Sequence, residues 1–243
     1  MNRHRLLLLA LLTLAFAGVA VLYVSNVRRD AATRFRTGLP VPASVLPEEL
    51  LGPGKTIPKG PPRPPEIRPD DPLLSGNASS AVTIIMYGDF QCEFCREQSQ
   101  ALEDALRLTD RRDQVRVVWR DLPMINDHPR SMVAASVAAC AARQGKFREM
   151  HDILFARATD LSDTEYLGFA KEIDLNLDAF QICLRDPAIS FRLMRDIEQA
   201  LSLSIASVPQ LFVDGQPVSV FLDKEALAAV IRKQLSLKTP PVR

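Results

Sequence analysis

Residues 89–98 read D-F-Q-C-E-F-C-R-E-Q and place two cysteines, Cys92 and Cys95, with two residues between them. Such a CxxC pair can hold a metal, form a structural crosslink or act as a redox couple, so its surroundings must decide. The preceding run V-T-I-I-M-Y, at residues 82–87, is continuously apolar and predicts a buried strand. The following sequence, R-E-Q-S-Q-A-L-E-D-A-L-R-L, is typical of a helix. The pair is therefore predicted to lie between a strand and a helix, with Cys92 near the helix start.

The rest of this region predicts an α/β fold interrupted by helices. V-R-V-V-W, at residues 115–119, predicts a second strand, which completes a βαβ unit. Residues 131–203 are helical throughout, and one of these helices begins at a capping box, Ser162 to Glu165. Two more strands, joined at Asp214-Gly215, and a final helix are predicted at 210–213, 217–221 and 223–235. A CxxC pair at the first helix of this layout predicts a thioredoxin-like fold with an inserted all-α subdomain.

Four segments within residues 80–236 carry a family resemblance. They read Y-G-D-F-Q-C-E-F-C-R, V-V-W-R-D-L-P-M-I-N-D-H-P, C-A-A-R-Q-G-K-F-R-E-M-H-D-I-L-F and S-V-P-Q-L-F-V-D-G. Together they resemble the DsbA-like branch of the thioredoxin superfamily, which comprises thiol–disulfide oxidoreductases with a helical insertion. The resemblance implies that Cys92 is the exposed nucleophile and Cys95 the buried resolving thiol. It also implies a cis peptide bond before Pro209 and a Val208 backbone that pairs with an extended substrate.

The residues between the cysteines depart from the family's strong oxidants, which carry Pro-His where this chain has Glu93 and Phe94. A carboxylate near a cysteine disfavours the thiolate, and a phenyl ring offers no hydrogen bond to sulfur. Arg96, directly after the motif, supplies a compensating positive charge. We therefore expect Glu93, Phe94 and Arg96 to tune Cys92, and the couple to be less oxidising than that of a Pro-His enzyme.

The other two cysteines, Cys140 and Cys183, both fall in the predicted helical insertion. They are either buried free thiols, which behave as small apolar side chains, or the two halves of a structural disulfide. An oxidising compartment favours the disulfide, and this is our prediction.

A zinc site at the CxxC pair would need two further ligands. The chain has no second CxxC, and His128 and His151 lie in the predicted insertion. His128, before Pro129, is typical of a turn or a helix start, and His151 of a packed or surface histidine rather than a base. We therefore predict no metal, and no cofactor other than the redox-active Cys92–Cys95 disulfide.

The N-terminus predicts a membrane anchor. Residues 6–27 contain no charged side chain. A secretory apolar region is usually about 7 to 15 residues long, whereas a spanning helix needs roughly 20. The competing reading is a signal peptide cleaved after Ala17, in A-F-A. Arginines flank both ends, so the positive-inside rule does not predict the orientation of this helix. An anchor and a cleaved signal peptide would both place the globular domain outside the cytoplasm. We expect a single-pass protein of a bacterial inner membrane, with its catalytic domain in the periplasm or another extracytoplasmic space.

A proline-rich segment, 29–79, follows the predicted anchor at 1–28. It holds most of the chain's 18 prolines, which remove the backbone donors that a helix or an inner strand requires. A flexible spacer is the predicted role, and a docking site for a polyproline-binding partner is the alternative. The DsbA-like domain is then predicted at 80–236, with its insertion at about 126–203, before a tail at 237–243.

Composition excludes one class of partner. The net charge is +1 and aromatic residues make up 6%, so neither a basic field nor base-stacking side chains predict nucleic-acid binding. The resemblance implies oxidation of thiols in exported proteins, with reoxidation by a membrane redox partner of the DsbB or VKOR type. Two alternatives remain: a reductase or isomerase fed by a membrane electron donor, and a peptide-binding chaperone on the same fold.

Overall fold

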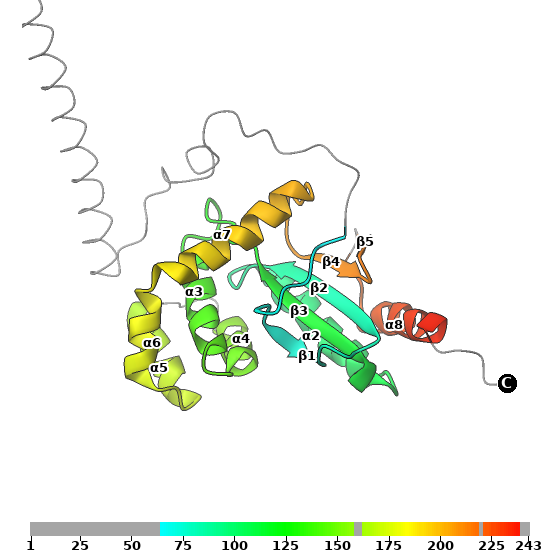
Figure 1. Cartoon of the computed structure of the whole chain (residues 1–243), viewed down its shortest axis with the longest axis horizontal. Helices are drawn as coiled ribbons and strands as arrows, with labels where there is room; N and C mark the ends of the chain where they lie inside the picture. The colour runs from blue at the N-terminus through cyan, green and yellow to red at the C-terminus, as the bar shows by residue number, and fades with distance from the viewer. Residues whose placement is uncertain (1–63, 158–161, 219–220, 239–243) are drawn as a thin grey trace, which may run out of the picture. The chain divides into compact units, whose positions relative to one another are not determined.

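A mixed five-stranded sheet lies at the centre of the computed structural model, which describes residues 64–157, 162–218 and 221–238 (Figure 1). The strands lie in the order β1 (Leu73–Ser75), β3 (Val115–Asp121), β2 (Val82–Gly88), β4 (Gln210–Val213) and β5 (Gln216–Val218). β2 and β3 are parallel, and every other neighbouring pair is antiparallel. Helix α2 (Glu93–Arg107) and a short 3₁₀ helix, η2 (Arg112–Gln114), connect β2 to β3. The predicted βαβ unit is therefore confirmed.

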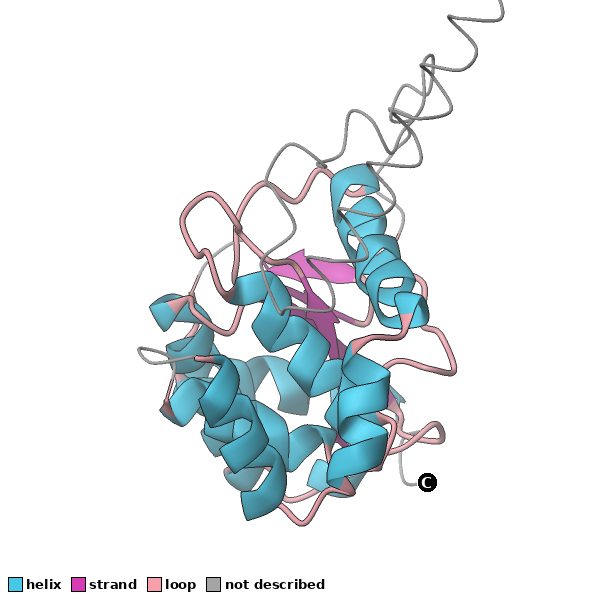
Figure 2. Cartoon of the chain, turned by 90° about the vertical axis from the view of Figure 1, so that its left-hand side faces the viewer, coloured by secondary structure: helices cyan, strands magenta, loops and turns pink. Residues whose placement is uncertain are grey.

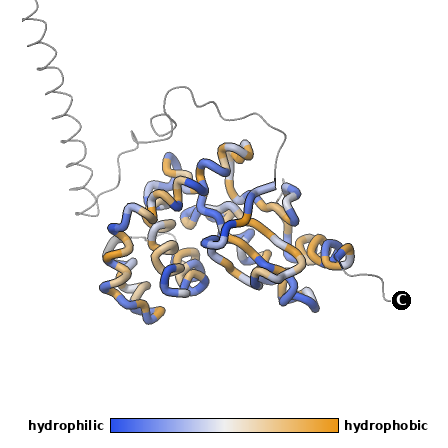
Figure 3. Tube along the Cα trace, viewed as in Figure 1, coloured by the Kyte–Doolittle hydropathy of each residue, from blue (hydrophilic) through white to orange (hydrophobic). Residues whose placement is uncertain are grey.

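Helices cover both faces of the sheet, which explains why β2 is apolar without alternation. On one face, α2 and α8 (Lys224–Lys238) share a hydrophobic cluster with Ile84 and Met86 of β2. On the other face, α7 (Pro187–Ser202) shares a second cluster with Ile85 and Tyr87. Figure 3 shows the resulting hydrophobic stretches along the central strands. Every residue of β2 is buried, as the prediction of a buried strand requires.

Five helices form the insertion between β3 and β4, and Figure 2 shows them grouped in front of the strands. They are α3 (Ser131–Ala142), α4 (Phe147–Ala156), α5 (Asp163–Glu172), α6 (Leu177–Leu184) and α7. The predicted capping box at the start of α5 is present. Cys140 of α3 and Cys183 of α6 are joined by a disulfide with a Cα–Cα distance of 5.7 Å.

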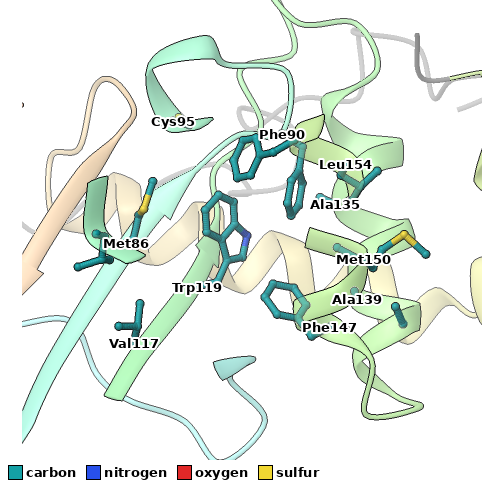
Figure 4. Close-up of a cluster of buried hydrophobic side chains, with 14 of the residues drawn as sticks. Met86, Phe90, Cys95, Val117, Trp119, Ala135, Ala139, Phe147, Met150 and Leu154 are labelled. Carbon is teal, nitrogen blue, oxygen red and sulfur yellow. The ribbon is translucent and has the colours of Figure 1, made fainter. Parts of the chain in front are cut away.

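An aromatic cluster joins the insertion to the sheet (Figure 4). Trp119 of β3 stacks on Phe90, with ring centroids 4.9 Å apart, and Phe155 of α4 packs against both rings. His151 lies buried among them, and burial lowers its pKa. Gly88 lies so close that a Cβ there would be 2.3 Å from the Trp119 ring, so this position requires glycine. His151 is thus a packed histidine in this structure.

The predicted linker extends too far toward the C-terminus. β1 pairs with β3 although residues 73–75 were assigned to the linker, and Trp119 donates its backbone N–H to the Pro72 carbonyl at 3.0 Å. The segment before β1 is held by Arg120, which is fully buried on β3 and pairs with Asp71. Proline lacks a donor but keeps its acceptor, so the chain can join a sheet at its edge. Residues 64–79 therefore belong with the folded domain.

Other boundaries differ by a few residues. β3 continues to Asp121, and α8 runs on to Lys238, into the predicted tail. β5 begins at Gln216, one residue early, and ends at Val218, with residues 219–220 outside the described part. The predicted anchor and the linker up to residue 63 also lie outside it. Across the part of the chain that the structure describes, no helix has the length and apolarity to span a bilayer.

Candidate active site

The two cysteines lie at the start of α2, where β2 leads through a short turn into the helix. Cys92 is the N-cap residue, and its sulfur accepts a hydrogen bond from the Cys95 backbone N–H at 3.3 Å. The first backbone N–H groups of a helix have no partner within it, and together with the helix dipole they favour a negative charge. Cys92 is 7% exposed and Cys95 is fully buried. The two sulfurs therefore occupy different environments although they belong to one helical turn.

These environments separate the two thiols chemically. Hydrogen bonding from Cys95 lowers the pKa of Cys92 to about 7, despite partial burial that acts in the opposite direction. Burial raises the pKa of Cys95, and the neighbouring Cys92 raises it further. Because the thiolate is the reactive form, this arrangement suits Cys92 for exchange with a second molecule and Cys95 for an internal role.

The pKa of Cys92 predicts how its reactivity depends on pH. In the reduced protein, the rate of alkylation by iodoacetamide should rise with pH through a midpoint near 7, because the lowered pKa makes thiolate available there. An unperturbed thiol would have a midpoint of about 8.5. Rates are measured by mass spectrometry of the alkylated Cys92 peptide, with Cys92→Ala as the control for other sites. A midpoint at the free-thiol value would contradict the prediction.

The residues predicted to form the substrate groove lie beside Cys92. The Val208–Pro209 peptide bond is cis, and the Val208 carbonyl oxygen is 3.9 Å from the Cys92 sulfur. Pro209 directly precedes β4, so the position of this loop follows from the pairing of β4 with β2. Segments separated by more than a hundred residues are thus brought together at one sulfur.

The residues predicted to tune Cys92 face solvent instead. The Glu93 side chain is 72% exposed and forms an ion pair with Arg96 at 3.1 Å. Phe94 is 64% exposed. After the hydrogen bonding from Cys95 and the effect of burial, the charge of Asp89 raises the pKa of Cys92 and that of His128 lowers it. Glu93 and Phe94 begin helix α2 and lie on its exposed side, so the tuning role predicted for them stays a prediction.

Asp89 and His128 belong to the site although the sequence did not predict a role for them there. The Asp89 side chain is fully buried and accepts hydrogen bonds from the backbone N–H groups of Gln91 and Met124, both at 2.7 Å. His128 Nδ1 lies 2.9 Å from an Asp89 oxygen. A signal was present, since the charged residue Asp89 directly follows an apolar strand and precedes the first cysteine by three positions. Its partner could not be found from local sequence.

A second unpredicted contact is made by a side chain of α2. Gln98 is buried, and its side chain donates to the Leu222 carbonyl at 2.9 Å and accepts from the Leu222 N–H at 3.1 Å. The pair fixes the segment before α8 against the active-site helix. Among the described residues, no group of three or more His, Cys, Asp or Glu side chains is arranged to hold a metal ion.

This chain is similar to known proteins in both sequence and fold. A family model described as thioredoxin matches residues 69–233. A thioredoxin-like oxidoreductase from Silicibacter pomeroyi DSS-3 has a TM-score of 0.61 at 24% identity, covering 70% of this chain and 94% of that one. The thiol-disulfide exchange protein alpha-DsbA2 from Wolbachia pipientis has a TM-score of 0.57 at 22% identity, covering 69% and 87%. At these identities the likeness to the solved structures is one of fold.

Curated relatives of a different kind match part of their own length. The Na(+)/H(+) antiporter NhaA 1 of Salinispora arenicola is 36% identical over 165 residues, which is 68% of this chain and 25% of the antiporter. The antiporter NhaA of Herminiimonas arsenicoxydans is 30% identical over 167 residues, covering 69% and 26%. This chain therefore spans about a quarter of the length of these relatives.

Proposed function

Because this chain belongs to the thioredoxin family, we propose that it is a DsbA-like, extracytoplasmic thiol–disulfide oxidoreductase that introduces disulfides into exported proteins. The single observation that carries the proposal is the Cys92 sulfur, with its pKa lowered to about 7, beside a fully buried Cys95. A stabilised thiolate at Cys92 favours the reduced protein, and a couple whose reduced form is stabilised is a better oxidant.

The reaction proceeds by two thiol–disulfide exchanges. A substrate thiolate attacks the Cys92 sulfur of the Cys92–Cys95 disulfide, which forms a mixed disulfide and displaces Cys95, where a proton is taken up. A second substrate thiolate then attacks the substrate sulfur of the mixed disulfide and displaces Cys92 as a thiolate. Two electrons pass from the substrate dithiol to the protein, and the substrate gains a disulfide.

The backbone beside Cys92 favours an extended, unfolded substrate. The Val208 backbone is next to the sulfur and is partly exposed, and an extended peptide can pair with a backbone segment of this kind. Phe94, between the two cysteines, is 64% exposed and offers an apolar side chain at the start of α2. Turnover requires that a membrane redox partner with an oxidised cysteine pair takes up the two electrons. The N-terminal apolar segment would keep the enzyme at the membrane where that partner lies.

A reductase or isomerase is the second candidate, and Asp89 is the observation that favours it. A buried carboxylate that raises the pKa of Cys92 disfavours the thiolate and makes the couple more reducing. The direction of catalysis therefore depends on the balance of charges at Cys92.

The equilibrium potential of Cys92–Cys95 in the full-length chain decides between the candidates. The protein is equilibrated in glutathione buffers, and its thiols are read by alkylation and mass. A donor of disulfides should have a potential between about −120 and −180 mV, and should oxidise a dithiol peptide stoichiometrically. A potential of about −270 mV would overturn the oxidase proposal in favour of a reductase.

A further inference from the structure

A buried carboxylate and its histidine partner, both outside the CxxC motif, act on the active-site sulfurs. Between the cysteines, Glu93 and Phe94 are exposed, and the charge of Glu93 is paired with Arg96 in solvent. Solvent screens such a pair strongly, so it acts weakly on a buried sulfur. The Asp89 carboxylate, by contrast, has no exposed surface and lies in the turn that delivers Cys92, whose N–H donates to the Asp89 carbonyl at 3.1 Å.

The loop after β3 encloses this carboxylate. The Met124 N–H donates to Asp89, and the His128 N–H donates in turn to the Met124 carbonyl at 2.8 Å. This turn brings the His128 ring to the same Asp89 oxygen that Met124 contacts. The His128 side chain is 26% exposed, so it connects the buried carboxylate to the surface.

The two charges act on the sulfurs in opposite directions. A negative charge at Asp89 disfavours the thiolate of Cys92, and a positive charge at His128 favours it. Asp89 likewise acts on Cys95. The carboxylate and the imidazole are in hydrogen-bond contact. Each therefore partly cancels the electrostatic effect of the other on the sulfur. Charge interactions are strong here since the carboxylate is removed from water.

We propose that Asp89 and His128 form a charge pair that sets how strongly the active site favours its dithiol form over its disulfide form. Both are positioning residues, because they act through Cys92 and Cys95. Asp89 makes the couple more reducing, and His128 offsets Asp89 and makes the couple more oxidising. The inference rests on the proposed exchange function of Cys92 and names residues that control its direction.

The test compares Asp89→Asn, His128→Asn and the double variant in the full-length chain. Asparagine at position 89 keeps an oxygen that can accept from the backbone but removes the charge. Asparagine at position 128 keeps a neutral donor near Nδ1 but removes the imidazole. Glu93→Gln is the matched control, since it makes the same carboxylate-to-amide change at an exposed position of the same turn. Fluorescence of Trp119, the chain's one tryptophan, reports whether each variant keeps its fold.

Two readouts apply that a purely structural role would not move: the thiolate absorbance of Cys92 against pH, and the equilibrium constant with glutathione. Asp89→Asn should lower the pKa of Cys92 and shift the equilibrium toward reduced protein on the order of tenfold. His128→Asn should shift both readouts in the opposite direction. In the Asp89→Asn background the His128 effect should become smaller, and Glu93→Gln should have less effect than Asp89→Asn.

Three outcomes would contradict the proposal of an Asp89–His128 charge pair. They are a folded Asp89→Asn protein with both readouts unchanged, a His128→Asn effect of equal size in both backgrounds, and a Glu93→Gln effect as large as that of Asp89→Asn. If Asp89→Asn does not fold, the His128→Asn variant tests the proposal alone, because His128 is partly exposed. An unchanged pKa of Cys92 in that variant would contradict the proposal. A wild-type protein that oxidises no dithiol peptide, while the variants still shift the equilibrium, would refute the proposed function and leave the charge pair standing.

Discussion

Alanine at Cys92 is expected to reduce thiol–disulfide exchange to the uncatalysed rate. Cys92 keeps 7% of its surface exposed whereas Cys95 keeps none, and its pKa is the one lowered to about 7. Cys95 cannot replace it, because Cys95 is fully buried and burial raises its pKa. The rate is measured as oxidation of a dithiol peptide by stoichiometric, pre-oxidised full-length protein, followed by mass.

Cys95→Ala provides the matched control for this experiment. With Cys92 retained, this variant should accumulate a mixed disulfide with glutathione. The Cys92 thiolate attacks glutathione disulfide and releases one reduced glutathione, and the buried thiol that normally resolves the complex is missing. Cys92→Ala should form none. If Cys92→Ala kept the exchange rate of the wild type, or if Cys95 carried the mixed disulfide, the assignment of roles would be wrong. A Cys92→Ala protein that still supported its cellular role in full would favour the chaperone alternative.

Removal of the Cys140–Cys183 disulfide is expected to have the largest effect on stability. The bridge closes a loop with a sequence separation of 43 residues. In the chain-entropy account, crosslinking such a loop stabilises the folded state by about 4 kcal/mol, because it restricts the unfolded chain. It joins α3 to α6 within the insertion, where both sulfurs belong to the hydrophobic core. The insertion should therefore open first when the bridge is lost.

The measurement is urea unfolding of the Cys140→Ala/Cys183→Ala protein against the wild type. Trp119 fluorescence follows the sheet and its contact with α4, and far-ultraviolet circular dichroism follows the helices. Cys92→Ala/Cys95→Ala is the control, because it removes the same number of thiols without opening the Cys140–Cys183 loop. Equal free energies of unfolding for the two double variants would rule out the stabilising role. So would a Cys140 that is alkylated in the native, unreduced protein.

The sequence alone determined the local part of the active site. An apolar run that ends at Gly88, two cysteines and a helix-forming stretch specify strand, turn and helix from neighbouring residues only. The same local rules placed β4, the capping box at Ser162 and the helical character of the insertion. Local hydrogen bonding and side-chain periodicity act over a few positions, so they can be read from a single sequence.

Tertiary structure decided the features that depend on distant partners. The segment before β1 reads as a linker because of its prolines, yet it packs on the sheet because buried Arg120 needs the carboxylate of Asp71. Glu93 follows the nucleophile directly but faces solvent, because its position on α2 points it outward. The Asp89 carboxylate is removed from water, because the loop after β3 covers it and His128, 39 residues away, contacts it. A charge acts according to its distance and its exposure to water, and both are properties of the folded chain rather than of the sequence spacing.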